Sequence, residues 1–276
     1  MGGEAKRRKA EIARLKLNSP EEAARWRQSQ QDRRELVRGI NPASQDPTPV
    51  AALARLLREE FEKAKLTGSI DAPIVLYQSV IATTRDDLSD IPVACGKGCS
   101  HCCHTWVSAT APEILYIAKI IKNTPVIDNV RATHQQTKDY DFDTRDQHPI
   151  PCPLLEQDLC SIYEARPMTC RLAASADAAI CARTYHNITN ENVPTPMMYL
   201  FGRASFAVAM SAGLRKADLP YHAYEFNAAL TRALDTEDSE RRWLAGEDIF
   251  GDIRRDPEDA LSQPQAQQLY RHAFTD

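Results

Sequence analysis

Eight cysteines limit what this chain of 276 residues can fold into, because all of them lie between positions 95 and 181. The stretch CGKGCSHCC holds four of them in the spacing C-x3-C-x2-C-C, and the other four follow at wider intervals. In chain order they are Cys95, Cys99, Cys102, Cys103, Cys152, Cys160, Cys170 and Cys181. Proteins use thiols at this density either as disulfides or as metal ligands.

Three properties of the chain favour a metal site over disulfides. The chain is long enough to bury a substantial apolar core without covalent cross-links. Its N-terminus lacks the apolar stretch of a secretory signal. The vicinal pair Cys102-Cys103 also suits a disulfide poorly, since bridged cysteines have Cα atoms about 5.5 Å apart and chain neighbours lie about 3.8 Å apart. We therefore predict metal binding.

The number of thiols indicates more than one metal ion. Thiolates prefer zinc, iron–sulfur clusters or Cu(I) over magnesium and calcium, and one structural zinc ion needs only four ligands. The predicted ligands are Cys95, Cys99, Cys102, Cys103, Cys152, Cys160 and Cys170. Two ions of iron or zinc, or an iron–sulfur cluster, fit this number. His101 and His104 could add nitrogen ligands, although a histidine beside cysteines more often supports a ligand or faces solvent.

The second cysteine block predicts a hairpin followed by a helix. In CPLLEQDLCSIYEARPMTCR, the residues PLL and CSIY flank a polar turn, and Pro167 marks the first helical position. Cys170 then falls in the first turn, where the helix dipole would lower the pKa of its thiol. Arg166 and Arg171 could offset the charge of a polythiolate site, or could form salt bridges with Glu164 or Asp177.

The combined pattern resembles the CxxCxxCC cysteine-cluster family, the YkgJ-like zinc- or iron-chelating domain. The matching positions are Cys95, Cys99, Cys102, Cys103, Glu113, Cys152, Pro153, Leu155, Cys160, Tyr163, Arg166, Pro167, Cys170 and Arg171. The resemblance covers roughly residues 91–175 and implies a metal centre with Tyr163, Arg166 and Arg171 beside the ligands. The first gap is one residue longer than the commoner pattern, and Cys181 lies outside it.

The rest of the chain is predicted to be mainly α: helices around an irregular, metal-organised cysteine segment with one short β-hairpin. Apolar periodicity indicates helices over 50–65, 72–88 and 126–138. Thr110 and Glu113 form the pattern of a capping box at the start of another helix. The polar run DYDFDTRDQHPIP, residues 139–151, is predicted as loop, and the apolar run Asn192 to Leu214 as a buried central helix rather than a membrane span.

Composition divides the chain into four predicted parts. These are a basic helical arm (1–42), a helical part (43–90), the cysteine segment (91–186) and a helical C-terminal part packing on it (187–276). Residues 1–40 hold eleven basic and six acidic residues, a net charge of +5 against −4 for the whole chain. Such an arm is most often a solvated helix face, but it could contact nucleic acid or a protein partner. The partner is unknown, and a cytoplasmic location is expected.

The prediction is therefore a protein that binds iron or zinc through a polythiolate cluster. One alternative is a metal-dependent protein-modifying enzyme, because flagellin lysine methylases have a similar cysteine pattern and are associated with an iron–sulfur cluster; Glu113 and Tyr163 are its candidate catalytic groups. Another is a zinc-structured adaptor that docks through the basic arm. Cys181 is predicted to be dispensable. Cys102 and Cys103 are predicted to point to different places, since neighbouring side chains diverge by about 100° on a helix.

Overall fold

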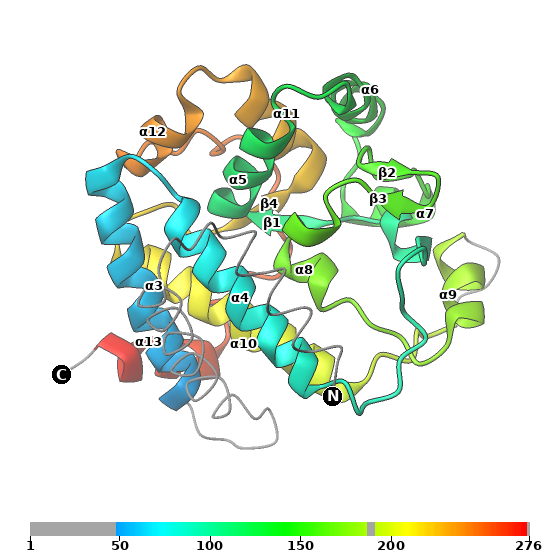
Figure 1. Ribbon diagram of the computed structural model, residues 1–276, viewed down its shortest axis with the longest axis horizontal. Coiled ribbons are helices and arrows are strands. Elements are labelled where there is room, and N and C mark those ends of the chain that lie inside the picture. Colours follow the sequence, from blue (N-terminus) through cyan, green and yellow to red (C-terminus); the bar gives the residue numbers. More distant parts are fainter. Residues whose placement is uncertain (1–47, 187–190, 275–276) are drawn as a thin grey trace, which may run out of the picture.

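The computed structural model describes residues 48–186 and 191–274, which form a mainly helical protein as predicted (Figure 1). The α-helices are α3 (Thr48–Thr67), α4 (Asp71–Asp87), α5 (Ala111–Ile121), α6 (Val126–Thr137), α7 (Phe142–Gln147), α8 (Met168–Arg171), α9 (Ala178–Tyr185), α10 (Met197–Lys216), α11 (Phe226–Asp235), α12 (Ser239–Leu244) and α13 (Pro264–Phe274). Two short 3-10 helices are η1 (His101–His104) and η2 (Tyr163–Ala165). The strands are β1 (Ser108–Thr110), β2 (Leu155–Glu156), β3 (Leu159–Cys160) and β4 (Ala223–Glu225).

The core is built on the packing of α3 against α10. The apolar face predicted for α3 is buried, with Leu53, Leu57 and Phe61 fully shielded from solvent. Gly213 of α10 lies so close to α3 that an added Cβ would stand 2.9 Å from the Cβ of Leu57. Glycine therefore permits the two helix backbones to approach, and α4 and α13 also pack on α3.

The helix α5 begins where the sequence predicts. Glu113 accepts hydrogen bonds from the backbone N–H (3.0 Å) and the hydroxyl (2.6 Å) of Thr110, so the capping box is formed. The side chains of Ile114, Ile117 and Ile121 are buried on one face of the helix. This face joins α5 to the common core, where α5 packs against α4 and α11.

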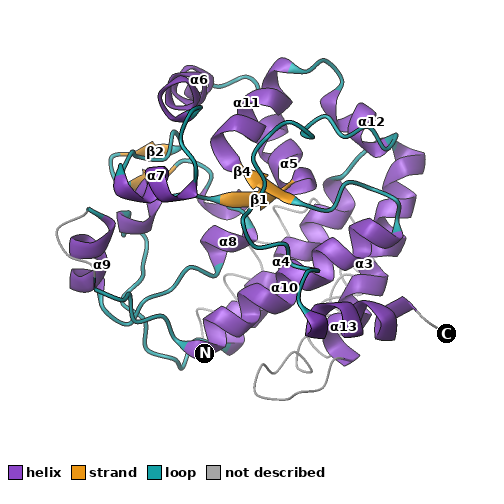
Figure 2. Cartoon of the chain, turned by 180° about the vertical axis from the view of Figure 1, so that it is seen from behind, coloured by secondary structure: helices purple, strands orange, loops and turns teal. Residues whose placement is uncertain are grey.

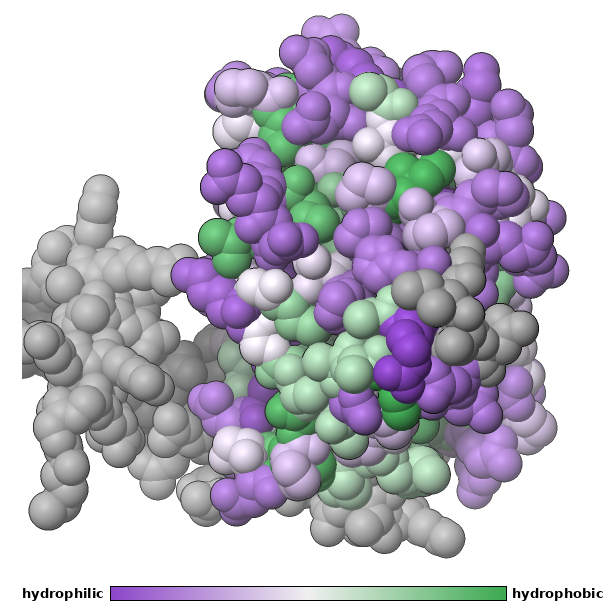
Figure 3. Space-filling model, turned by 90° about the vertical axis from the view of Figure 1, so that its right-hand side faces the viewer, coloured by the Kyte–Doolittle hydropathy of each residue, from purple (hydrophilic) through white to green (hydrophobic). Residues whose placement is uncertain are grey.

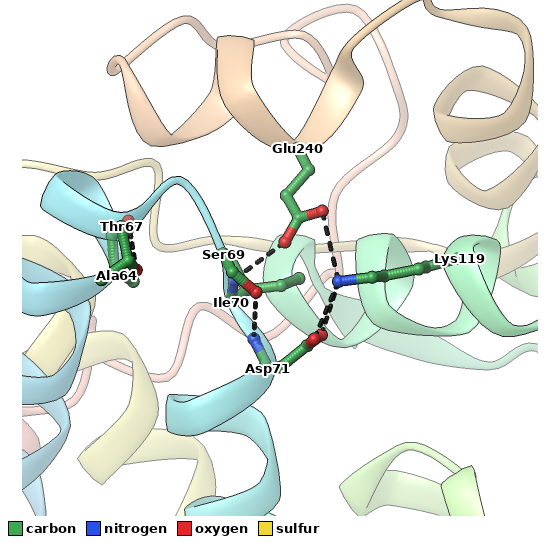
Figure 4. Close-up of polar contacts among 7 residues, drawn as sticks. All are labelled: Ala64, Thr67, Ser69, Ile70, Asp71, Lys119 and Glu240. Atoms are coloured by element: carbon green, nitrogen blue, oxygen red, sulfur yellow. Dashed lines mark hydrogen bonds and ion pairs between the residues drawn. The ribbon is translucent and has the colours of Figure 1, made fainter.

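A group of polar contacts fastens the exposed side of α5 to its neighbours (Figure 4). The Lys119 ammonium lies 2.8 Å from a carboxylate oxygen of Asp71, at the start of α4, and 3.7 Å from Glu240 of α12. The other Glu240 oxygen accepts a hydrogen bond of 2.8 Å from the backbone N–H of Ile70. The turn between α3 and α4, helix α5 and helix α12 thus meet at one point.

Two antiparallel strand pairs complete the fold (Figure 2). In one, β1 pairs with β4, and Ala109 lies opposite Tyr224. In the other, β2 pairs with β3, with Leu155 opposite Cys160, which confirms the predicted hairpin. The first pair joins residues that are distant in sequence, and it brings the chain before α5 to the chain before α11.

The predicted helices over 50–65, 72–88 and 126–138 are confirmed as α3, α4 and α6. The prediction of loop over 139–151 is wrong in part, because α7 lies within it. The Asp141 side chain accepts a hydrogen bond of 2.8 Å from the backbone N–H of Thr144 and so caps a helix too short to show periodicity. The basic arm of residues 1–42 lies outside the described residues, and the division into four parts stays a prediction.

The predicted central helix is confirmed as α10. Of the helices in the described ranges, only α10 is long and apolar enough to cross a membrane. Half of its most apolar 18-residue stretch is buried inside the fold. A core helix passes the same test. Exposed apolar side chains near its start are Met197, Leu200 and Phe201. Figure 3 shows the face of the molecule that lies at the right of Figure 1, where α9 is. On this face, apolar residues gather mainly in the lower half of the surface, among hydrophilic ones.

Candidate metal centre

Backbone hydrogen bonds bring the two cysteine blocks together. The N–H of Cys152 donates to the carbonyl of Cys103 at 2.7 Å, and the N–H of Ile150 donates to the carbonyl of His104 at 3.2 Å. At the other end of the first block, the Ser175 N–H lies 3.2 Å from the Cys95 sulfur. Residues 95–104 are therefore held between the second block and the segment that leads into α9.

Two side chains that the sequence interpretation missed fix this arrangement. The Arg145 guanidinium, only 2% exposed, donates to the carbonyls of His104 (2.8 Å) and His148 (2.9 Å). The carboxylate of Asp158 accepts a hydrogen bond of 2.7 Å from the Ser100 hydroxyl. Both connect one block to the chain near the other. Arg145 lies in α7, within the segment that was predicted as loop, so no pattern in the sequence singled it out.

The hairpin places two of the thiols. Gln157 and Asp158 form its turn with φ of 49° and 62°, the left-handed conformation that a tight two-residue turn between antiparallel strands requires. Neither residue is a glycine, and Asp158 is held there by its bond to Ser100. Cys160 ends β3, and Cys152 lies just before β2.

Helix α8 carries Cys170 and is anchored by Glu113. The second oxygen of the Glu113 carboxylate accepts a hydrogen bond of 2.7 Å from the backbone N–H of Met168, the first residue of α8. Pro167 occupies the position before the helix rather than its first residue, one place earlier than predicted. Glu113 is thus a positioning residue that couples α5 to the thiol-bearing helix, with both of its oxygens engaged.

The predicted lowering of the Cys170 pKa is wrong for the metal-free protein. Burial raises the pKa of this thiol far above its usual range, and the charges of Cys152 and Cys102 act in the same direction. The helix has only four residues, so its dipole is too small to oppose desolvation. Burial likewise raises the pKa of Cys152 to about 12. These thiols are neutral at physiological pH until a metal replaces their protons.

The thiols form two groups that share Cys102. Burial raises the pKa of Cys95, with further contributions from the charges of Cys99, Cys102 and Cys181. The charges of Cys152, Cys102 and Cys160 act on Cys170 in the same way. One group therefore contains Cys95, Cys99 and Cys181, and the other contains Cys152, Cys160 and Cys170.

Cys181 belongs to the first group. It is 5% exposed, and burial is the largest cause of its raised pKa. A hydrogen bond with the Ser175 side chain lowers this pKa, and the charges of Cys99 and Cys102 raise it further. This location brings Cys181 to the first thiol block, although the sequence pattern left it out; that Cys181 is dispensable for metal binding stays a prediction. Its distance in sequence from Cys170 is bridged because α9 packs against η1.

The vicinal pair is the second correction in the thiol set. A hydrogen bond between the side chains of Cys102 and Cys103 is the largest cause of the strongly raised Cys102 pKa, so the two thiols meet instead of pointing apart. Both residues lie in the single turn η1. The Cα–Cβ bonds of neighbouring residues point in different directions, but rotation about each Cα–Cβ bond can still turn the two sulfur atoms toward each other.

Arg166 and Arg171 differ in what they contact. The Arg166 guanidinium lies 3.6 Å above the ring of Tyr163. Its charge lowers the pKa of Cys102 against the larger effect of the Cys103 side chain, and lowers that of Cys160 and Cys170 against the larger effect of burial. Arg171 instead donates to the backbone carbonyls of Arg166 and Glu164. Arg166 is therefore the cation that faces the thiols, and Arg171 supports the loop that carries it.

Three histidines lie beside the thiols. The His101 Nδ1 lies 3.4 Å from the His186 Nε2, and the rings of His104 and His186 are 4.8 Å apart. The His104 Nδ1 lies 3.1 Å from the Ser100 carbonyl. His186, at the end of α9, was not singled out from the sequence. Burial and the neighbouring charges of His104 and His101 lower its pKa.

The residues present fit zinc or iron by the chemistry of their donors. All eight cysteines are free thiols, and seven of them are half-buried. Within residues 48–186 and 191–274, no three histidine, cysteine, aspartate or glutamate side chains are already arranged to hold an ion.

Comparison with known families agrees with the residues found here. The family model CxxCxxCC, described as "Putative zinc- or iron-chelating domain", matches residues 94–193. This confirms the resemblance predicted from the sequence, and the matched range includes Cys181. No curated protein and no solved structure matches the chain.

Proposed function

Because residues 94–193 match the CxxCxxCC family of zinc- or iron-chelating domains, we propose that this protein binds zinc or iron in a centre made of all eight cysteines. The observation that carries the proposal is that the thiol blocks are joined in space, by the hydrogen bond from the Cys152 N–H to the Cys103 carbonyl and by the contact of the Ser175 N–H with the Cys95 sulfur. The effects of the thiols on one another's pKa divide them into two groups around Cys102. Each group supplies three thiols, and the vicinal pair supplies one more to each. Four thiolates per ion is the usual structural zinc shell and also suits iron.

In this proposal one ion is bound by Cys95, Cys99 and Cys181, and the other by Cys152, Cys160 and Cys170. Cys102 and Cys103 are divided between the two ions, which is consistent with the contact of their thiols. An iron–sulfur cluster would use the same donors. The bound metal supplies folding free energy, and Arg166 offsets the negative charge of the thiolates.

The protein's own residues prepare the centre. Glu113 holds α8 and its Cys170 in place. Arg145 and Asp158 hold the first block against the second. A reducing compartment keeps such thiols available for metal, so we place the protein in the cytoplasm. The adaptor interpretation depends on the basic arm, which lies outside the described residues.

The test is metal analysis and an ultraviolet–visible spectrum of full-length protein purified without oxygen. We expect two equivalents of metal per chain, with strong visible colour if the metal is iron. Cys181→Ser and Cys170→Ser should each lower the metal content, because they remove ligands from different ions. Leu154→Ala is the control, since it shortens a buried side chain between Cys152 and Cys160 without removing a thiol.

A Cys181→Ser variant with full metal content would refute the eight-cysteine centre. Metal loss in Leu154→Ala equal to that in the cysteine variants would mean that loss reports unfolding rather than ligation. A single equivalent of metal in the wild-type protein would replace two sites with one.

A further inference from the structure

A cavity of about 540 Å³ lies beside the metal centre but outside it. Its walls come from β1, β4, α8, α10 and the chain that leads into α13. These elements are labelled in Figure 2. Thr169 lines the cavity, and the next residue, Cys170, belongs to the thiol group. Cavities of roughly 300–1,000 Å³ are the size that holds small organic molecules.

One wall of the cavity is apolar and made of small side chains. Ala204, Ala207 and Val208 lie at intervals of three and four along α10, so they form one stripe facing the space. Ala109 and Ala223 from the strand pair β1–β4 add to the apolar lining. These residues leave room for a ligand and offer it no hydrogen-bonding groups beyond the backbone, so the body of the ligand is apolar.

Arg203 gives the cavity a positive charge that no neighbour neutralises. It is half-buried and lines the cavity, yet it forms no hydrogen bond or ion pair with any residue of the described ranges. Three other arginines, by contrast, have acidic partners: Arg131 is paired with Asp235, Arg183 with Glu191 and Arg232 with Asp252. A guanidinium withdrawn from water is stabilised by an anion that accepts its forked hydrogen bonds.

The remaining charges on the cavity wall limit the ligand to one negative charge. Arg255 already lies 3.8 Å from Asp248 and 3.1 Å from the His222 Nε2, so it is not free to bind a second anionic group. Asp256, Glu258 and Asp259 also line the space, together with Glu113, whose two oxygens are already engaged. These carboxylates would repel a dianion such as a phosphate monoester more strongly than a monoanion.

We propose that this cavity binds a small organic monocarboxylate, with Arg203 holding the carboxylate and the stripe Ala204, Ala207 and Val208 contacting its apolar body. The site is separate from the metal centre, and its occupancy does not depend on which metal is bound there.

The experiment is isothermal titration calorimetry on the full-length, metal-loaded protein with benzoate and hexanoate. Their uncharged amides and phenyl phosphate serve as comparison ligands. We expect the carboxylates to bind about ten- to a hundredfold more tightly than the amides, the range given by one charge-assisted contact. Phenyl phosphate should bind more weakly than benzoate.

Variants locate the contact. Arg203→Gln should remove the advantage of carboxylate over amide, and Ala204→Phe should block both by filling the space. Arg241→Gln, which removes an exposed charge on α12 outside the cavity lining, should bind like the wild type. Equal binding of benzoate and benzamide, no binding of either carboxylate at millimolar concentration, or unchanged affinity in Arg203→Gln would each overturn the proposal.

Discussion

The helical body and the metal centre are stabilised by different physical means. Helix α3 buries eight apolar side chains and α10 buries a matching face, so the body gains its stability by removing apolar surface from water. In residues 91–107, which contain the first thiol block, only Ser100 is buried. That stretch is held by backbone hydrogen bonds and by the Arg145 and Asp158 contacts. A net hydrogen bond contributes only about 1 kcal/mol.

The difference shows what the metal contributes. Hydrogen bonds bring the thiols close but do not converge them, and burying neutral thiols adds little apolar area. We therefore expect the body to fold without metal and the centre to depend on it. A change in the helical body can therefore be compared with the behaviour of the metal centre, and a change in the centre with that of the body.

Removal of the metal should give the largest effect. Chelation is expected to unfold residues 91–186 more than the flanking helices, because metal-binding free energy is folding free energy in such a segment; zinc-finger peptides gain about 10–16 kcal/mol from it. Hydrogen exchange followed by mass spectrometry should show lost protection at 91–107 and 150–186, with α3 and α10 still protected. Unchanged protection across the segment would show that the centre folds without its metal.

The second effect is a steep dependence of metal affinity on pH. Burial raises the pKa of Cys95, Cys152 and Cys170, so their thiols hold protons at neutral pH in the metal-free protein. A metal must displace these protons, and lowering the pH therefore weakens binding. Affinity should fall tenfold per pH unit for each proton displaced, measured by competition with a chelator. Cys152→Ser should displace fewer protons; the same slope in this variant would contradict the assignment.

A third change acts on the body alone. Gly213→Ala should lower the free energy of unfolding by about 1–3 kcal/mol, because the new Cβ would stand 2.9 Å from the Leu57 Cβ. Gly202→Ala, in the same helix, meets only the Leu172 Cδ1 at 3.8 Å. It should raise stability by about 0.5–1 kcal/mol through helix propensity. Denaturant titration measures both, and equal destabilisation of the two variants would disprove the close approach. Metal content should be unchanged in each.

A fourth change acts on the centre alone. Arg166→Gln should weaken metal binding about tenfold, or about 1.4 kcal/mol, because it removes the cation that faces Cys102, Cys160 and Cys170. Arg166→Lys keeps the charge and should recover most of the affinity. Arg183→Gln, on the surface of α9, serves as the comparison. Equal affinities of the glutamine and lysine variants would exclude a role for the charge.

The smallest effect is expected at the polar contact of α5 with α4 and α12. Lys119→Ala should cost about 0–1 kcal/mol, since its side chain is 46% exposed, that of Asp71 is 50% exposed and such pairs are weak in water. The loss should shrink further in high salt. A loss of several kcal/mol in thermal unfolding would mean that this contact contributes as much as the buried core does.

Features set by neighbouring residues could be predicted from the sequence. The capping box of α5 needs only Thr110 and Glu113, three positions apart, and the hairpin needs only the polar turn between two short apolar runs. The seven predicted ligands come from the spacing of the cysteines and from the family resemblance; the fold gathers them in one region, and their role as ligands stays a prediction. Helix α7 was not predicted because its six residues are too few to show the apolar periodicity of a helix.

What could not be predicted depends on contacts between distant residues. The pairing of β1 with β4, the second hydrogen bond of Glu113 to Met168 and the approach of Cys181 to the first block all join segments that no local pattern relates. The contact between the Cys102 and Cys103 thiols was predicted wrongly because backbone direction does not fix side-chain rotamers. That Arg203 has no hydrogen-bond or ion-pair partner among the described residues could not be predicted either, because it depends on which distant residues surround it in the fold.

The packing of α3 on α10 also sets an order in time. The chain is synthesised from its N-terminus, so every cysteine leaves the ribosome before the helix that α3 needs as its partner. Closing that contact confines one long loop, and its entropic cost grows with the logarithm of the loop's length. In the proposed centre, the ion bound by Cys95, Cys99 and Cys181 would remove about two-thirds of this loop and would lower the cost by about 1 kcal/mol. Metal acquired by the nascent chain would therefore make the last step of folding easier as well as completing the centre.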